Sequence, residues 1–138
     1  MKTIKQKEPD IRELTKAESQ VMQVLWDLGK GMVNQILEKF PDPKPAYNTV
    51  STIVRILEQK GFIGHKAYGR THEYFPLINK KDYTRSYFRN FLAGYFGNSY
   101  QSLASFFAND GNLSIKDLEE IQRTIHEELS KQKNTRRS

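Results

Sequence analysis

The 138-residue sequence predicts a mainly α-helical protein that carries a small β wing. Before Gly61, apolar residues recur at helical spacing. In the two segments after it, apolar and polar residues alternate with the period of two that is typical of strands. Further segments with helical spacing follow residue 79. We therefore expect a winged helix-turn-helix domain at residues 1–78 and a three-helix arm at residues 79–138.

The composition favours an anionic partner and excludes several kinds of functional site. The chain has 22 basic and 16 acidic residues, and residues 43–72 hold five basic residues against the single acidic Glu58. Cysteine is missing, which excludes disulfides, thiolate metal sites and thiol catalysis. Because the sequence shows neither an apolar run of about 18 residues nor a secretory signal, we expect a cytoplasmic protein without membrane insertion.

The first helix is expected at Lys16–Leu28, after a polar lead-in at residues 1–13. Thr15 and Glu18 have the spacing of a capping box, and Gly29 ends the helix. Its apolar face holds Val21, Met22, Val24, Leu25 and Leu28. A lone tryptophan such as Trp26 could stack on a ligand, but packing beside a small core is the more common role.

The second helix is expected at Val33–Phe40, and the third lies within Pro45–Gly61 and begins at Tyr47 after the stiff PDPKP loop. The third helix has two different faces, the inner one formed by Val50, Ile53, Val54 and Leu57 and the outer one by Asn48, Thr52, Arg55 and Gln59. Short hydrogen-bonding groups and one arginine suit base edges in a major groove. The alternative is a solvated amphipathic helix.

Two strands are expected next, at Phe62–Ala67 and Thr71–Pro76, joined by Tyr68-Gly69-Arg70. This hairpin forms the wing, and Gly69 supplies the positive φ that its loop needs. Lys66 and Arg70 are either ordinary solubilising charges or phosphate contacts, and a position beside a recognition helix favours phosphate.

The arm is expected to contain helices at Lys80–Gly94 and Ser99–Ala108 and a last helix capped by Ser114, followed by a basic tail, KQKNTRRS, without regular structure. Nine aromatic residues lie between positions 83 and 107, more than three such helices can bury in one subunit. A homodimer is the simplest explanation, and a loosely packed monomeric tail is the alternative. The expected dimer interface comprises Phe91, Leu103, Phe107, Leu118, Ile121, Ile125 and Leu129.

The sequence offers no credible active site, metal site or cofactor site. His65, His72 and His126 are its only histidines, and no cysteine or carboxylate cluster lies beside the first two. Gly-rich phosphate loops, HExxH and GxSxG do not occur. The pairs Glu119-Glu120 and Glu127-Glu128 are best interpreted as solvated helix surface. We therefore expect a protein that is not an enzyme.

Double-stranded DNA is the partner that these patterns favour. We expect Asn48, Ser51, Thr52 and Arg55 to face bases, and Thr49, Lys66 and Arg70 to face phosphates. The alternative is a winged-helix protein-interaction module whose polar face binds an acidic protein.

Three stretches of the chain resemble the penicillinase-repressor (BlaI/MecI/CopY) family of bacterial transcriptional repressors. They are LTKAESQVMQVLW, NTVSTIVRILEQKGFIGHKAYGRTHEYFPLI and SLASFFANDGNLSIKDLEEI, and the likeness covers roughly Leu14 to Leu129. The resemblance implies a winged-helix domain, a helical dimerisation domain, and homodimers that repress transcription from palindromic operators. The family's late recognition-helix arginine corresponds to Ile56, with Arg55 before it, so the operator sequence is expected to differ.

The resemblance also implies a way to end repression. Antibiotic-responsive members are cut within their dimerisation helices in response to a membrane-bound sensor with a zinc-peptidase domain. The family's scissile Asn-Phe pair corresponds to Phe106-Phe107, which makes these residues the candidate cleavage site. The copper-responsive members use C-terminal cysteines that this chain lacks.

Overall fold

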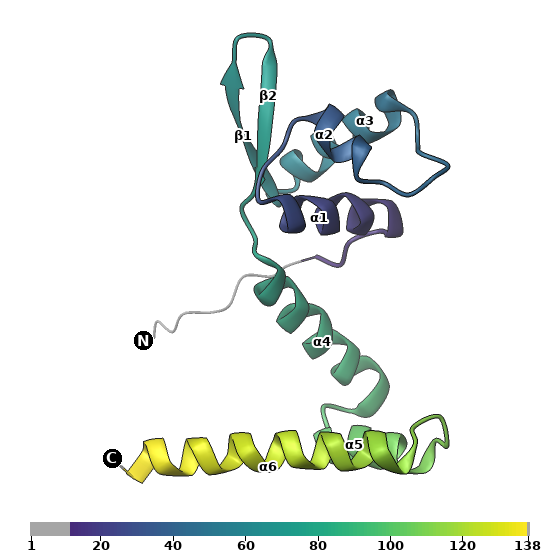
Figure 1. The fold of residues 1–138 in the computed structure, drawn as a ribbon, viewed down its shortest axis with the longest axis vertical. Helices are drawn as coiled ribbons and strands as arrows, with labels where there is room; N and C mark the ends of the chain where they lie inside the picture. Colours follow the sequence, from purple (N-terminus) through teal and green to yellow (C-terminus); the bar gives the residue numbers. More distant parts are fainter. Residues whose placement is uncertain (1–11, 138) are drawn as a thin grey trace. The chain divides into compact units, whose positions relative to one another are not determined.

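The structure, a computed structural model, describes residues 12–137 and contains helices and one hairpin (Figure 1). In chain order the elements are α1 (Lys16–Leu28), α2 (Val33–Glu38), α3 (Tyr47–Gln59), β1 (Ile63–Tyr68), β2 (Thr71–Pro76), α4 (Lys80–Phe96), α5 (Tyr100–Asn109) and α6 (Ile115–Arg137). The chain forms two compact units that divide within α4, between Phe88 and Arg89. The predicted fold class, mainly α with a small β wing, is confirmed.

Helix α1 begins and ends as its sequence predicts. The Thr15 hydroxyl accepts a hydrogen bond from the Glu18 backbone N–H at 3.1 Å, and Glu18 Oε1 accepts one from the Thr15 N–H at 3.0 Å. This capping box satisfies two backbone donors that the helix leaves free. At the other end Gly29 has a φ of 84°, which explains why glycine follows Leu28.

Several element boundaries differ from the sequence prediction, among them those of α4, which ends at Phe96 instead of Gly94, and of α5, which runs from Tyr100 to Asn109 instead of from Ser99 to Ala108. Helix α2 ends at Glu38 instead of Phe40, because Lys39 and Phe40 donate to carbonyls three residues back and so close a tighter turn. Strand β1 runs from Ile63 to Tyr68 and not from Phe62 to Ala67. Phe62 is instead a core residue, 2% exposed, whose carbonyl accepts a hydrogen bond from the Leu77 N–H.

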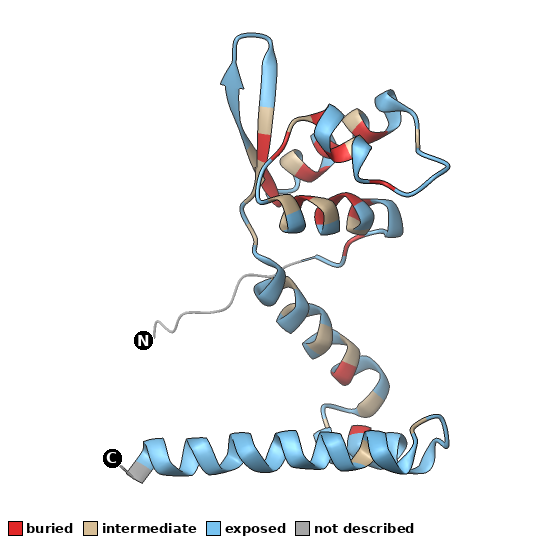
Figure 2. Ribbon diagram, in the orientation of Figure 1, coloured by how far each residue is buried: buried red, intermediate tan, exposed pale blue. Residues whose placement is uncertain are grey.

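The first unit has one hydrophobic core shared by its three short helices and the base of the hairpin (Figure 2). From the inner face of α3, Val50, Val54 and Leu57 are fully buried in it, and the half-buried Ile53 packs against it. Val21, Met22 and Leu25 from α1 and Ile36 from α2 are also fully buried. Close packing of this kind fixes the rotation of α3 about its own axis, and therefore which side chains it presents outward.

Glu18 is the one buried charged residue among those described, at 5% exposure. Its Oε2 accepts a hydrogen bond at 2.8 Å from the ammonium of Lys60, at the C-terminal end of α3. Burial alone would raise the pKa of the Glu18 carboxyl, but the Lys60 charge and the hydrogen bonds from Thr15 hold this pKa below its usual value. One carboxylate therefore joins the start of α1 to the end of α3.

The wing is an antiparallel pair in which Ile63 lies opposite Pro76 and Tyr68 opposite Thr71. Gly69, in the turn, has a φ of 65°, as its position in the hairpin requires. The Gly31 N–H donates to the Tyr74 carbonyl at 2.9 Å, and the Tyr74 N–H donates back to the Gly31 carbonyl at 2.8 Å. This bridge fixes β2 to the segment between α1 and α2, as an isolated hairpin requires for stability.

The first turns of α4 belong to the first unit and pack on its core through aromatic side chains. The Tyr83 ring lies 5.9 Å from the Trp26 ring and 6.1 Å from the Phe62 ring, centroid to centroid. The Tyr83 hydroxyl accepts a hydrogen bond from the Leu14 N–H, and the Trp26 indole N–H donates to the Ile78 carbonyl, both at 2.9 Å. The interpretation of Trp26 as a packing residue is therefore confirmed.

The second unit buries little of its apolar surface. Leu92 and Leu103 are its buried residues among those described, whereas α6 is exposed along most of its length (Figure 2). Helix α6 also continues through the tail to Arg137, so the expectation of an irregular tail is wrong. Lysine, glutamine and arginine are good helix formers, and positive charge near a helix C-terminus is favourable, which explains the extension.

The Glu18–Lys60 pair leads to a stability prediction. In Lys60→Met the carboxylate stays buried without its cation, so we expect the free energy of unfolding at pH 7 to fall by about 1–3 kcal/mol. Because the folded-state pKa of Glu18 is lowered, the pair stabilises the fold above the unfolded pKa of about 4.3, and this contribution is lost as pH falls through the folded pKa.

Urea unfolding from pH 7 down to about pH 3 measures this effect. The gap between the wild-type protein and Lys60→Met should narrow as the solution becomes acidic. Lys39→Met, which removes an exposed cation after α2, is the matched control and should change stability by less than about 0.5 kcal/mol. A gap that is the same across the whole pH range would contradict the role assigned to the pair.

Candidate nucleic-acid interface

The outer face of α3 carries the residues that the sequence analysis assigns to bases. Asn48, Thr52 and Arg55 are exposed, and Ser51 is half-buried. The Arg55 guanidinium lies 3.4 Å from the Thr52 hydroxyl, so these two side chains form one polar surface. All four residues project from a helix that is anchored on its other side by the fully buried Val50, Val54 and Leu57, which gives them a fixed orientation.

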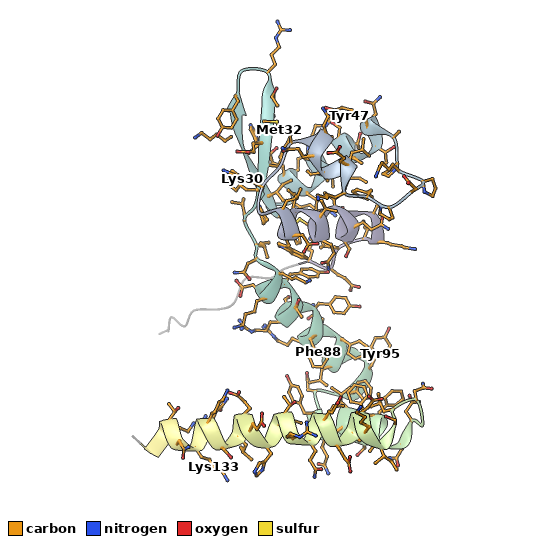
Figure 3. All side chains as sticks on the ribbon, in the orientation of Figure 1. Lys30, Met32, Tyr47, Phe88, Tyr95 and Lys133 are labelled. Carbon is orange, nitrogen blue, oxygen red and sulfur yellow. The ribbon has the colours of Figure 1, made fainter. Side chains whose placement is uncertain are left out.

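A groove of about 310 Å³ lies between α2, α3 and the wing. Of the residues assigned to DNA, Ser51 and Arg70 line it. It is also lined by Met32 and Tyr47, which are labelled in Figure 3, and by Val33, Asn34, Gln35, Thr71, His72 and Tyr74. The structure thus brings Arg70 of the wing to the same groove as the first turns of α3.

Five polar residues of this groove, Asn34, Gln35, Tyr47, Thr71 and His72, are absent from the predicted contact set. Tyr47 could have been found, because it is the first residue of α3 and its side chain is 48% exposed. Asn34 and Gln35 belong to a helix of only six residues, whose placement beside the wing follows from tertiary packing. No local pattern in the sequence signals that placement.

Lys66 and Arg70, which were both assigned to phosphates, do not lie together on the wing. Lys66 lies opposite Glu73 in the strand register, and its ammonium is 5.3 Å from the centre of the Tyr68 ring. Because side chains alternate along a strand, Lys66 is on the face opposite His65. Arg70 in the turn lines the groove, whereas Lys66 does not line it. Thr49, the third residue assigned to phosphates, is exposed on the first turn of α3.

The other face of the wing carries His65, His72 and Tyr74. The two imidazole rings are stacked, with centroids 4.1 Å apart and planes 10° apart. His65 Nδ1 is hydrogen-bonded to the carboxylate of Glu58 on α3, and His72 Nδ1 lies 3.5 Å from the Tyr74 hydroxyl. Burial raises the pKa of that hydroxyl, and the nearby Glu58 charge raises it further.

Within residues 12–137, no group of three or more histidine, cysteine, aspartate or glutamate side chains is arranged to hold a metal ion. The same residues contain no helix that is long and apolar enough to cross a membrane. The interface consists instead of hydroxyl, amide and guanidinium groups. These are the groups that donate hydrogen bonds to base edges and phosphate oxygens.

The residues assigned to a dimer interface fall into two groups in the second unit. Leu103 is buried, and Phe91 and Leu118 are half-buried. Phe107, Ile121, Ile125 and Leu129 are 41%, 41%, 61% and 51% exposed. Leu113, Ile121 and Ile125 help to line a shallow apolar groove of about 470 Å³ on α6. Phe106, in the candidate cleavage pair, is 51% exposed.

Comparison with known proteins gives consistent matches over most of the chain. A family model described as penicillinase repressor matches residues 14–127. The methicillin resistance regulatory protein MecI of Staphylococcus aureus (strain N315) is 26% identical over 115 residues, which cover 83% of this chain and 94% of that protein. The penicillinase repressor of Bacillus licheniformis is 24% identical over 124 residues, which cover 89% of this chain and 97% of that protein.

Among solved structures, the DNA-binding domain of the repressor BlaI is similar to this chain. It aligns with a TM-score of 0.45 and 29% sequence identity, over 57% of this chain and 94% of that domain.

Proposed function

This chain belongs to the penicillinase repressor family, and we propose that it is a transcriptional repressor that binds a palindromic operator as a homodimer. The resemblance inferred from the sequence is thereby confirmed. The family consists of transcriptional repressors, which are not enzymes, so the expectation of no catalytic role is confirmed as well. Because its partner is DNA, we place the protein in the cytoplasm.

One observation carries the DNA-binding proposal. The outer face of α3 presents short polar side chains and Arg55, while the inner face is anchored by three fully buried residues. A rigid helix with such an outer face suits insertion into a major groove. We propose that Asn48, Ser51, Thr52 and Arg55 contact bases.

The phosphate contacts are proposed for residues beside this helix. Thr49 is exposed on the first turn of α3, and Arg70 lines the groove next to it. Lys66 lies on the other face of the wing, where it would contact a backbone that passes along that side. These contacts would hold α3 in place along the duplex without selecting its sequence.

The dimer proposal rests on the exposed apolar stripe of α6. Ile121, Ile125 and Leu129 recur at helical spacing and remain exposed in the single chain. A soluble protein rarely leaves such a stripe uncovered, and a second copy of the same helix would cover it. Burial of one leucine-sized side chain contributes about 1.5–3 kcal/mol, so a few such residues suffice for association.

We further propose that cleavage at Phe106-Phe107, driven by a membrane-bound sensor peptidase system, ends repression. The two side chains are 51% and 41% exposed on α5. A cut there would separate α6, with its apolar stripe, from the rest of the chain. The dimer would then lose its proposed interface, and each winged helix would bind DNA alone.

Selection of bound sequences from a pool of random duplexes tests the DNA-binding proposal. We expect the full-length protein to enrich a palindrome, because two identical subunits would bind two half-sites. Loss of a base contact in Arg55→Ala should cost about 1–3 kcal/mol and relax specificity at one position of each half-site. Loss of a phosphate contact in Arg70→Ala should weaken binding to all sequences and leave the enriched sequence unchanged.

Two results would count against this assignment. Identical specificity profiles for Arg55→Ala and Arg70→Ala would show that Arg55 contacts no base. Failure of the wild-type protein to enrich any sequence, with only salt-sensitive binding to random duplexes, would favour the protein-interaction module.

Sedimentation of α6 variants tests the dimer proposal. A charge at the centre of the stripe, in Ile121→Glu, should dissociate the dimer and leave the winged helix folded, because burial of an unpaired carboxylate is strongly unfavourable. A chain that ends at Phe106 should also be monomeric. Ser130→Glu adds the same charge on the opposite side of α6, about two and a half turns beyond Ile121, and should remain dimeric. If both the Ile121 variant and the truncated chain stay dimeric, the dimer is built elsewhere and the proposed release mechanism fails.

A further inference from the structure

His65 and His72 are stacked on one face of the wing, next to the groove that Arg70 lines. Arg70 is a proposed phosphate contact, and both histidines are titratable. His72 lines the groove together with Arg70, whereas His65 lies behind it and is bonded to Glu58. Imidazole is the side chain whose charge changes between about pH 5 and pH 8. No metal site was expected at these two residues, and no other role was assigned to them.

Several charged or titratable groups surround His72. From the wing these are His65 on β1, Tyr74 on β2 and Arg70 in the turn. From α3 they are Tyr47, which lines the same groove, and Arg55 and Glu58, whose charges act on the neighbouring Tyr74. Glu58 is the acid of this set, and it is bonded to His65. Among the described residues that line the groove there is no carboxylate, so nothing in the lining would repel an anion.

The stacking places the two imidazole rings side by side, with only His72 in the lining of the groove. A charge on His65 is balanced by Glu58, its hydrogen-bond partner. His72 is exposed and lines the groove with Arg70, and its partner there is the neutral Tyr74 hydroxyl at 3.5 Å. An anion in the groove would favour a charge on His72, because a nearby opposite charge stabilises the charged form. A phosphate of bound DNA is such an anion.

We propose that the groove between α2, α3 and the wing binds one backbone phosphodiester of the DNA, and that His72 joins Arg70 in this contact by taking up a proton. The inference rests on the proposed function and deepens it. The hydroxyls of Tyr47 and Thr71 supply neutral hydrogen-bond donors at the same site. DNA binding is then coupled to protonation, and affinity rises as pH falls, because the bound state holds one more proton per subunit.

Salt dependence measured at two pH values tests the proposal on the full-length protein. Each phosphate that a cation neutralises adds about 0.9 to the slope of log affinity against log salt concentration. The wild-type slope should therefore be steeper by about 0.9 per bound subunit near pH 6 than near pH 8. Fluorescence anisotropy with the selected operator duplex and with a random duplex gives both slopes.

Matched variants separate the charge of His72 from the shape of its ring. His72→Phe keeps an aromatic ring against His65 and should show the same slope at both pH values. His72→Lys carries a permanent charge and should show the steeper slope at both. His126→Phe on α6, a histidine outside the wing, should behave as the wild-type protein.

Two outcomes would overturn the inference. One is a pH-dependent slope that persists unchanged in His72→Phe, and the other is a wild-type slope that is equal at both pH values. Both can be read on random duplexes, because a phosphate contact does not depend on sequence. Failure of the proposed function would look different, as equal affinity for operator and random duplexes.

Discussion

The geometry of the first unit depends on the hydrogen bonds of one buried group, the Glu18 carboxylate. One oxygen completes the capping box that starts α1, and the other binds the Lys60 ammonium at the end of α3. Two helices that are distant in sequence therefore share a single buried group, and the hydrophobic core between them fixes their packing. The proposed recognition helix needs this constraint, because a small rotation of α3 would change the direction in which Arg55 projects.

The wing depends on a second constraint of the same kind. Tyr74 pairs with Gly31 through two backbone hydrogen bonds, so β2 cannot move independently of the segment before α2. That attachment forms the groove, since Arg70 and His72 reach it only because the hairpin is held beside α2 and α3. The second unit is built differently, with an exposed apolar stripe on α6 in place of a large core. The first unit fixes the orientation of its side chains, and the second leaves an apolar stripe exposed.

The features that could be predicted from the sequence are those that neighbouring residues determine. A capping box and a glycine define α1, helical spacing defines the buried face of α3, and the positive φ of Gly69 marks the hairpin turn. Contacts between distant elements were not predictable in this way. The approach of α2 to the wing, which places Arg70 in the lining of their shared groove, follows from the pairing of Tyr74 with Gly31. The tail was misjudged because its polarity hid good helix propensity.

The central claim is that two linked subunits bind two half-sites at once. The most direct test uses two duplexes, one with both half-sites of the selected operator and one in which a half-site is scrambled. The affinity of the full-length protein and the number of chains bound are measured for each duplex. The account predicts two chains on the intact operator and an affinity higher by about 10²–10⁴ than on the single half-site. Equal affinities, with one chain bound to each duplex, would contradict it.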